Sequence, residues 1–110
     1  MLICYMKELY ALHADICKIF SNPTRLEILY LLKDKELSVT EIIQKTKLSQ
    51  ANISQHLSIM KSREFVSSIR KGKNIYYKLN NPKIIKALDL IQDVLIARLK
   101  ENNKFMGWGK

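Results

Sequence analysis

The sequence is short of several residue types, and each shortage excludes a class of protein. Its 110 residues include only two cysteines, too few for a small secreted domain held together by disulfides. Three glycines and two prolines are few for a loop-rich all-β fold, so long regular elements are favoured. No stretch approaches the roughly 20 uncharged apolar residues that a membrane-spanning helix needs. The first residues lack the basic leader and cleavage site of a signal peptide, so we expect a cytoplasmic protein with reduced thiols and no membrane partner.

Acidic residues are also scarce, and the resulting charge favours a polyanionic partner. Only 10 Asp and Glu stand against 19 Lys and Arg, which gives a formal net charge of +9 at pH 7. A field of this sign attracts nucleic acid first and an anionic membrane surface second, and it raises the rate of association. The sequence holds no HExxH motif, glycine-rich phosphate loop or nucleophile–base pair. We therefore expect a binding protein without a cofactor and not an enzyme.

Apolar residues recur at helical spacing near both ends of the chain, over residues 1–19 and 82–103. The apolar positions are Leu2, Tyr5, Leu9, Leu12, Ile16 and Ile19 in the first segment, and Ile84, Leu88, Ile91, Leu95 and Leu99 in the last. In both segments further apolar residues widen the stripe beyond what one small core covers. We therefore expect two dimerisation helices that pair across a two-fold axis in a homodimer. The tail over 104–110, with Trp108, breaks the periodicity.

Three helix-start signals lie between these segments. The stretch 21–24, Ser-Asn-Pro-Thr, offers a capping side chain followed by proline in the first helical position. Residues 38–41, Ser-Val-Thr-Glu, are typical of a capping box, and Ser49 fits the cap of a further helix. The inward positions of that further helix are Ile53, Leu57 and Met60. The short connection at 46–48 joins the helix that starts at the capping box to the helix capped by Ser49, which predicts a helix-turn-helix.

A β-hairpin follows the helix-turn-helix directly. Residues 65–70 and 75–79 are rich in β-branched and aromatic residues, and 71–74 is a turn. Three cations crowd at its tip, namely Arg70, Lys71 and Lys73. Like charges this close repel one another unless an anion neutralises them, so we expect a DNA-contacting wing over 65–79. A lone hairpin is only marginally stable, so the wing must pack on the helices.

Together these elements predict a mainly α fold with one β-hairpin, in the order α-α-α-α-β-β-α of a winged helix-turn-helix. We expect a single domain over 1–110, in which 20–80 is the DNA-binding core. Three stretches of this core resemble motifs of the ArsR/SmtB family of winged-helix repressors, namely FSNPTRLEIL at 20–29, LSQANISQHL at 48–57 and RKGKNIYYKL at 70–79. The resemblance implies a dimeric repressor that binds double-stranded DNA and releases it when an effector shifts the dimer.

The second helix of a helix-turn-helix lies in the major groove, with its N-terminal residues at the base edges. Here that end offers Ser49, Gln50, Asn52, Ser54 and Gln55. The resemblance favours Gln50, Ser54 and Gln55 as the base-reading residues, whereas the helical phase of Asn52 is less certain. Glutamine and asparagine side chains can bond adenine through two atoms, and serine can bond several bases. We therefore predict sequence-specific binding to an imperfect inverted repeat.

Contacts to the DNA backbone are expected from helix starts and from the wing. Hydroxyls and free N–H groups at a helix start can hold phosphates, and Lys and Arg neutralise them. The candidates are Ser38, Thr40, Lys61, Arg70, Lys71 and Lys73, together with Ser49. His56 stands where the family commonly has a histidine. Because it borders Ile53 and Met60 on the helical wheel, we expect a structural role for it.

Neither of the family's usual metal sites is present in this sequence. The cysteines of the family's ELCVCDL motif are replaced by Ser38 and Thr40, whose hydroxyls cannot supply the thiolates that soft metals prefer. The last-helix zinc site needs histidine, but that helix has only Asp89 and Asp93.

Cys4, His13 and Cys17 in the first helix are the remaining metal candidates. His13 and Cys17 are four positions apart and share a helix face, so the chain could be a metal- or thiol-responsive sensor. The simplest alternative makes both cysteines small buried apolar residues. A winged helix that binds protein instead of DNA is a further alternative. In that case the second helix of the helix-turn-helix, the recognition helix, should be acidic or apolar and the wing should be neutral.

Overall fold

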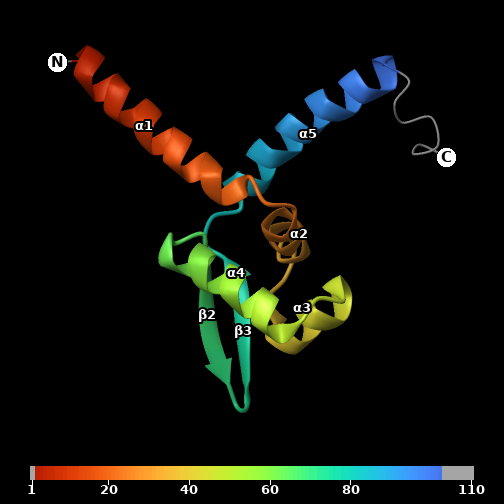
Figure 1. The fold of residues 1–110 in the computed structure, drawn as a ribbon. Helices are drawn as coiled ribbons and strands as arrows, with labels where there is room; N and C mark the ends of the chain where they lie inside the picture. The colour runs from red at the N-terminus through yellow and green to blue at the C-terminus, as the bar shows by residue number, and fades with distance from the viewer. Residues whose placement is uncertain (1, 103–110) are drawn as a thin grey trace. The chain divides into compact units, whose positions relative to one another are not determined.

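The computed structural model describes residues 2–102, with side chains from Cys4 onward, so the predicted tail over 104–110 lies outside this range. The elements run in the order α1 (Leu2–Phe20), α2 (Pro23–Leu31), β1 (Leu37–Ser38), α3 (Val39–Thr46), α4 (Gln50–Ser62), β2 (Val66–Lys71), β3 (Asn74–Leu79) and α5 (Lys83–Glu101), as labelled in Figure 1. Two compact units make up the chain, Met1–Asn80 with α1 to β3, and Asn81–Lys110 with α5. The predicted mainly helical winged helix-turn-helix is confirmed.

Side-chain caps begin α2 and α4 where the sequence predicted them. Asn22 Oδ1 accepts a hydrogen bond of 3.1 Å from the Arg25 N–H, and proline fills the first turn of α2. Ser49 Oγ accepts a bond of 3.2 Å from the Asn52 N–H and so begins α4. Each cap satisfies a backbone donor that has no partner inside its own helix, which fixes where the helix starts.

The predicted capping box at the start of α3 is also confirmed. Ser38 Oγ accepts a bond of 3.1 Å from the Glu41 N–H, and the Glu41 carboxylate accepts one of 3.0 Å from the Ser38 N–H. The hydrogen bonds from the backbone and side chain of Ser38 lower the pKa of Glu41. At neutral pH the box is therefore held by an ionised carboxylate near the positive end of the helix.

The turn between α3 and α4 closes without a glycine. Lys47 takes the left-handed conformation with φ 63°, and its N–H donates to Ile43 O at 2.8 Å. Thr46 Oγ1 donates to Ile42 O at 2.9 Å and accepts from the Leu48 N–H at 3.3 Å. These bonds end α3 and hold the connection that leads into α4.

The hairpin is part of a three-stranded antiparallel sheet in the order β1-β3-β2. The register runs from Val66↔Leu79 to Lys71↔Asn74, and β1 adds Leu37↔Tyr77 and Ser38↔Tyr76. The predicted hairpin is confirmed, but its turn is shorter than 71–74 and consists of Gly72 and Lys73, with Gly72 at φ +63°. The prediction of only one hairpin missed β1, because two residues are too short to show a strand pattern in sequence.

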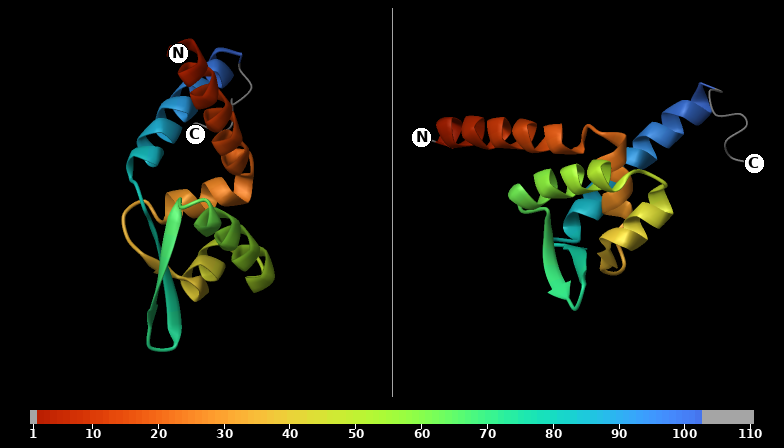
Figure 2. Two further views of the ribbon diagram at one scale, coloured as in Figure 1. Left: turned by 90° about the vertical axis from the view of Figure 1, so that its left-hand side faces the viewer. Right: turned by 60° about the horizontal axis from the view of Figure 1, so that its bottom comes forward.

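The core of the first unit collects apolar residues from every element between α1 and β2. Its buried side chains are Ile19, Ile28, Leu29, Leu32, Leu37, Ile42, Ile53, Leu57, Met60 and Val66. The three predicted inward positions of α4 are thus confirmed. Burying each such side chain contributes about 1.5–3 kcal/mol, so the inner face of α4 is anchored while its outer face is free for contacts. Figure 2 shows the hairpin extending beyond α3 and α4 in two further views.

Two helices leave much of their apolar surface uncovered. On α1 the exposed side chains are Tyr5, Leu9, Tyr10, Leu12 and Ile16, and on α5 they are Leu90, Ile91, Val94 and Leu95. Pro82 is the cap residue at the start of α5, and Asn81 Oδ1 accepts a hydrogen bond of 3.0 Å from the Lys83 N–H. Among the described residues, no helix combines the length and apolarity needed to cross a bilayer.

Candidate nucleic-acid interface

The outer face of α4 is polar and exposed. Gln50, Ser54 and Gln55 are all exposed, whereas the opposite face of the helix is buried in the core. Asn52 is half-buried, and its N–H is held by the Ser49 cap. Amide and hydroxyl groups on a firmly seated helix suit hydrogen bonding to base edges.

The helix starts differ in what they offer a phosphate. Thr40 is exposed on the first turn of α3, and Ser49 is exposed at the start of α4. Ser38 is only 5% exposed, and the capping box engages both its hydroxyl and its N–H. The prediction of a phosphate contact by Ser38 therefore needs correction, because pairing of β1 with β3 buries this residue. Its role is to hold the start of α3.

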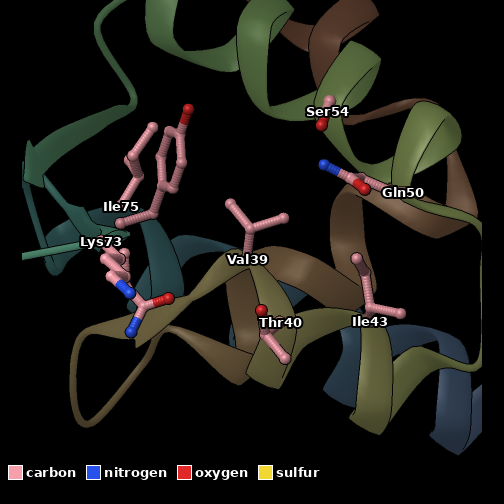
Figure 3. A pocket seen from close by; sticks show the side chains of 9 residues that line it. Val39, Thr40, Ile43, Gln50, Ser54, Lys73 and Ile75 are labelled. Carbon is pink, nitrogen blue, oxygen red and sulfur yellow. The ribbon is translucent and has the colours of Figure 1, made fainter.

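A hollow of about 280 Å³ lies between α3, α4 and the wing (Figure 3). It is lined by Val39, Thr40, Ile43, Gln50, Ser54, Lys73, Asn74, Ile75 and Tyr77. In Figure 3 the Gln50 and Ser54 side chains come from α4 on one side, and Lys73 and Ile75 come from the wing on the other. Apolar carbon beside amide, hydroxyl and ammonium groups suits a sugar–phosphate strand, whose sugars are apolar and whose phosphates are anionic. Sequence reasoning missed the hollow because its walls are far apart along the chain.

The cations of the wing are in different situations. Arg70 and Lys73 are exposed near the tip, where Arg70 Nε lies 3.5 Å from Gly72 O. Lys71 forms an ion pair with Glu36, and its Nζ lies 5.3 Å from the centre of the Tyr76 ring. The hydrogen bond and charge of Glu36 raise the pKa of Lys71. Lys71 therefore already has an anionic partner, which the sequence analysis did not identify.

Lys61 lies at the other end of α4, next to the hairpin. Its Nζ donates to Ser68 Oγ of β2 at 2.7 Å, and the lysine is exposed. The bond links the last turn of the recognition helix to the base of the wing. The ammonium group retains further donors for a phosphate.

His56 has the structural role that the sequence predicted, with a partner that the sequence did not identify. Arg25 Nε donates to His56 Nδ1 at 3.1 Å, so this ring nitrogen is an acceptor and carries no proton. Burial, with a further effect of the Arg25 charge, lowers the pKa of His56. The side chain therefore belongs to the packing between α2 and α4.

The three metal candidates of α1 stay separate from other ligand residues. Cys4, His13 and Cys17 are all exposed in the single chain, so the alternative of buried apolar cysteines would need a dimer partner to cover them. Over residues 4–102, no three His, Cys, Asp or Glu side chains come together in a group that could hold a metal ion. A metal or thiol response through these residues stays a prediction.

This chain is similar both to a described protein family and to individual known proteins. Residues 22–68 match the family described as bacterial regulatory protein, arsR family. The transcriptional repressor PagR of Bacillus anthracis is 46% identical over 83 residues, which cover 72% of this chain and 83% of PagR.

Solved structures agree over a longer stretch. A crystal structure of the Mycobacterium tuberculosis protein Rv0081 superposes with a TM-score of 0.77 at 30% identity, covering 86% of this chain and 95% of that one. A solution structure of a homodimeric winged helix-turn-helix DNA-binding domain from Mycobacterium bovis gives a TM-score of 0.75 at 28% identity, covering 87% and 89%. This chain therefore belongs to the arsR family of bacterial regulatory proteins and is a transcriptional regulator with a winged helix-turn-helix DNA-binding domain.

Proposed function

We propose that the protein is a homodimeric repressor that binds an imperfect inverted repeat in double-stranded DNA. The observation that carries this proposal is the exposed polar face of α4 beside a cationic hairpin in the same compact unit. Each subunit places one α4 in the major groove, and a two-fold axis brings the two helices to successive grooves about 34 Å apart. The repressor assignment is supported by the name of the relative PagR.

Base reading falls to the uncharged face of α4. Gln50 and Gln55 can each bond adenine through N6 and N7, and Ser54 can bond several bases. The half-buried Asn52 is a secondary candidate. These contacts supply discrimination between sequences, since amides and hydroxyls add no net attraction to phosphate.

Backbone contacts fall to the charged groups and to the hollow. The proposed phosphate contacts are Ser49, Thr40, Lys61, Arg70, Lys71 and Lys73. The strand that passes between α4 and the wing would rest in the hollow, which both Thr40 and Lys73 line. Lys71 reaches a phosphate by exchanging its Glu36 partner for the DNA.

Dimerisation follows from the uncovered apolar faces of α1 and α5. Exposed apolar patches of this kind mark association surfaces, because their burial removes them from water. The homodimeric relative from Mycobacterium bovis supports the same assembly for this chain. Because the proposed ligand is genomic DNA, we place the protein in the cytoplasm.

A selection from random-sequence duplexes, combined with a mass measurement in solution, tests the proposal. We expect enrichment of an inverted repeat and the mass of two chains. If the dimer neutralises about eight phosphates, log K should fall with log salt at a slope of about −7. Failure to enrich any sequence, an affinity that ignores salt, or a single subunit at high concentration would each contradict the proposal.

The exposed thiols favour one variant of this proposal, in which metal or oxidation at α1 changes operator binding. Cys17 and His13 lie one helical turn apart, and both are open to solvent. Gel-shift experiments with and without chelator and reductant test the variant. Equal operator affinity under all conditions would remove it and leave the DNA-binding proposal intact.

A further inference from the structure

One side chain of α2 reaches two other helices. Arg25 Nε donates to His56 Nδ1 in the middle of α4 at 3.1 Å, and Arg25 Nη1 donates to Ile19 O in the last turn of α1 at 3.4 Å. The Arg25 backbone is itself fixed, because its N–H is held by the Asn22 cap. The guanidinium therefore links the end of α1 to the recognition helix from a fixed point in α2.

The chemistry of the link suits arginine and an unprotonated histidine. A guanidinium presents several donors in a rigid planar fork, so two partners in different directions can be bonded together. The compact ammonium of a lysine lies at a single point and cannot reproduce this geometry. Both Arg25 and His56 are partly buried, which strengthens a charge-assisted bond relative to one in water.

Other contacts hold α1 to the far end of α4. Asp15 of α1 forms an ion pair with Arg63, the C-terminal cap residue of α4. The Phe20 ring, at the end of α1, lies edge-on to Phe65 with ring centres 4.8 Å apart. Both contacts act beyond the last turn of α4. The Arg25 link differs because His56 directly follows the base-reading residue Gln55.

We propose that Arg25 is a positioning residue for DNA recognition, which fixes the base-reading part of α4 to the end of α1 through His56. This inference rests on the proposed function and adds how the recognition helix is held. If α1 contributes to the dimer interface, then the position of α4 relative to α1 sets the separation of the two recognition helices. Loosening the link would impair binding to two half-sites together more than binding to one.

Protonation of His56 would break the link. A proton on Nδ1 removes the acceptor and places a second cation beside the guanidinium. In the described part of the chain, Arg25 of α2 is the charged group that acts on His56 of α4, and the Asp15–Arg63 pair joins α1 to the C-terminal cap of α4. Acidification adds positive charge to the protein and by itself strengthens attraction to DNA. A loss of operator affinity at low pH would therefore have the sign opposite to general electrostatics.

The first test compares the selected inverted repeat with a duplex in which one half-site is scrambled. Arg25→Lys keeps the net charge but loses the fork, and His56→Leu removes the acceptor. For both variants we expect about a tenfold loss on the full repeat, which corresponds to about 1.4 kcal/mol. On the half-site duplex we expect a change below about twofold, because the base-reading face is unaltered. His56→Asn, whose amide oxygen can take the place of Nδ1, should bind both duplexes like the parent protein.

The second test is the pH profile of operator binding from pH 7.5 down to pH 4.5, a range that extends to the acidic side because the pKa of His56 is lowered. The parent protein should lose affinity as the pH falls, and His56→Asn should not, because its amide does not titrate. His13→Asn changes the only other histidine of the chain and should keep the parent profile. A flat parent profile, or a profile abolished by His13→Asn instead, would overturn the proposal.

A third measurement needs no DNA and separates this inference from the proposed function. The ¹⁵N spectrum of His56 at pH 7.5 should show an unprotonated Nδ1 and a protonated Nε2, and Arg25→Lys should shift the Nδ1 signal. If this holds while no DNA sequence is enriched, the proposed function fails and the link stands. If an inverted repeat is enriched but folded Arg25→Lys and His56→Leu both bind the full repeat and the half-site duplex like the parent protein, the inference about Arg25 fails alone.

Discussion

The recognition helix and the wing face the same hollow but are built on opposite principles. The α4 helix buries Ile53, Leu57 and Met60 completely, and its N-terminal half presents uncharged amide and hydroxyl groups outward. The wing tip is exposed and carries its charge on Arg70, Lys71 and Lys73. A helix that contacts base edges must be held firmly, because hydrogen bonds depend steeply on distance and angle. A hairpin that contacts phosphates can be exposed, because the attraction between charges depends only weakly on geometry. Under the proposed function, α4 supplies the base contacts that give specificity, and the wing supplies much of the charge that gives affinity.

The largest expected effect comes from removing the anchor of α4. Leu57→Ala should lower the free energy of unfolding by about 2–5 kcal/mol, because Leu57 is fully buried and its truncation leaves a cavity. The matched change in the wing, Ile69→Ala, should cost less than about 1 kcal/mol, because Ile69 is 43% exposed. Urea denaturation of both variants measures the difference. Equal losses would show that the wing is as firmly anchored as α4.

The next largest effect is on base reading. Gln50→Ala should weaken binding to the selected operator by about 1–3 kcal/mol and leave binding to unrelated duplexes unchanged, because only a base contact is lost. Gln44→Ala provides the matched control, since Gln44 is an exposed glutamine of α3 outside the hollow. Competition gel shifts measure both. A loss of equal size on every duplex would reassign Gln50 to backbone contact.

Removing a charge from the wing should affect all duplexes, in contrast to removing a base contact, which affects only the operator. Lys73→Gln should weaken binding to all duplexes alike and make the salt slope less steep by about 1 for each subunit, because one phosphate contact per subunit is lost. Lys33→Gln removes the same charge from an exposed position between α2 and β1. Titrations at several salt concentrations measure the slope. An unchanged slope for Lys73→Gln, or an equal change for Lys33→Gln, would contradict a specific phosphate contact at the tip.

The smallest expected effect is a gain in DNA affinity, whereas the two preceding changes weaken DNA binding. Glu36→Gln should tighten binding to unrelated duplexes by less than about 1 kcal/mol, because Lys71 no longer exchanges an ion pair for a phosphate. The salt slope should become steeper in the same experiment. Lys71→Gln in the same background should cancel the gain. If Glu36→Gln weakens binding, the ion pair supports the wing instead of competing with DNA.

Signals confined to a few neighbouring residues were sufficient to predict the local structure. The caps at Asn22, Ser38 and Ser49 each join residues three positions apart, so their geometry is encoded in the residue types themselves. The inward face of α4 follows from helical periodicity in the same way. The exposed face that carries Gln50, Ser54 and Gln55 could therefore be identified from the sequence alone.

Contacts between distant residues needed the tertiary structure. Arg25 and His56 are 31 positions apart, and Lys71 and Glu36 are 35 apart, with nothing in either local pattern to indicate the partner. Ser38 illustrates both a local effect and a tertiary effect. Its spacing to Glu41 predicted a cap correctly, but its predicted phosphate contact was wrong because pairing of β1 with β3 buries it.

The sequence by itself determined where helices start, which faces they bury and which surface carries the charge. These properties depend on the chemistry of residues within one or two helical turns, which is the same wherever the chain goes. Only the tertiary structure decided which cation has an anionic partner, which histidine nitrogen is an acceptor and where the hollow lies. Those outcomes depend on which side chains the packing brings within about 3 Å of one another, and hydrogen bonds act over no longer range.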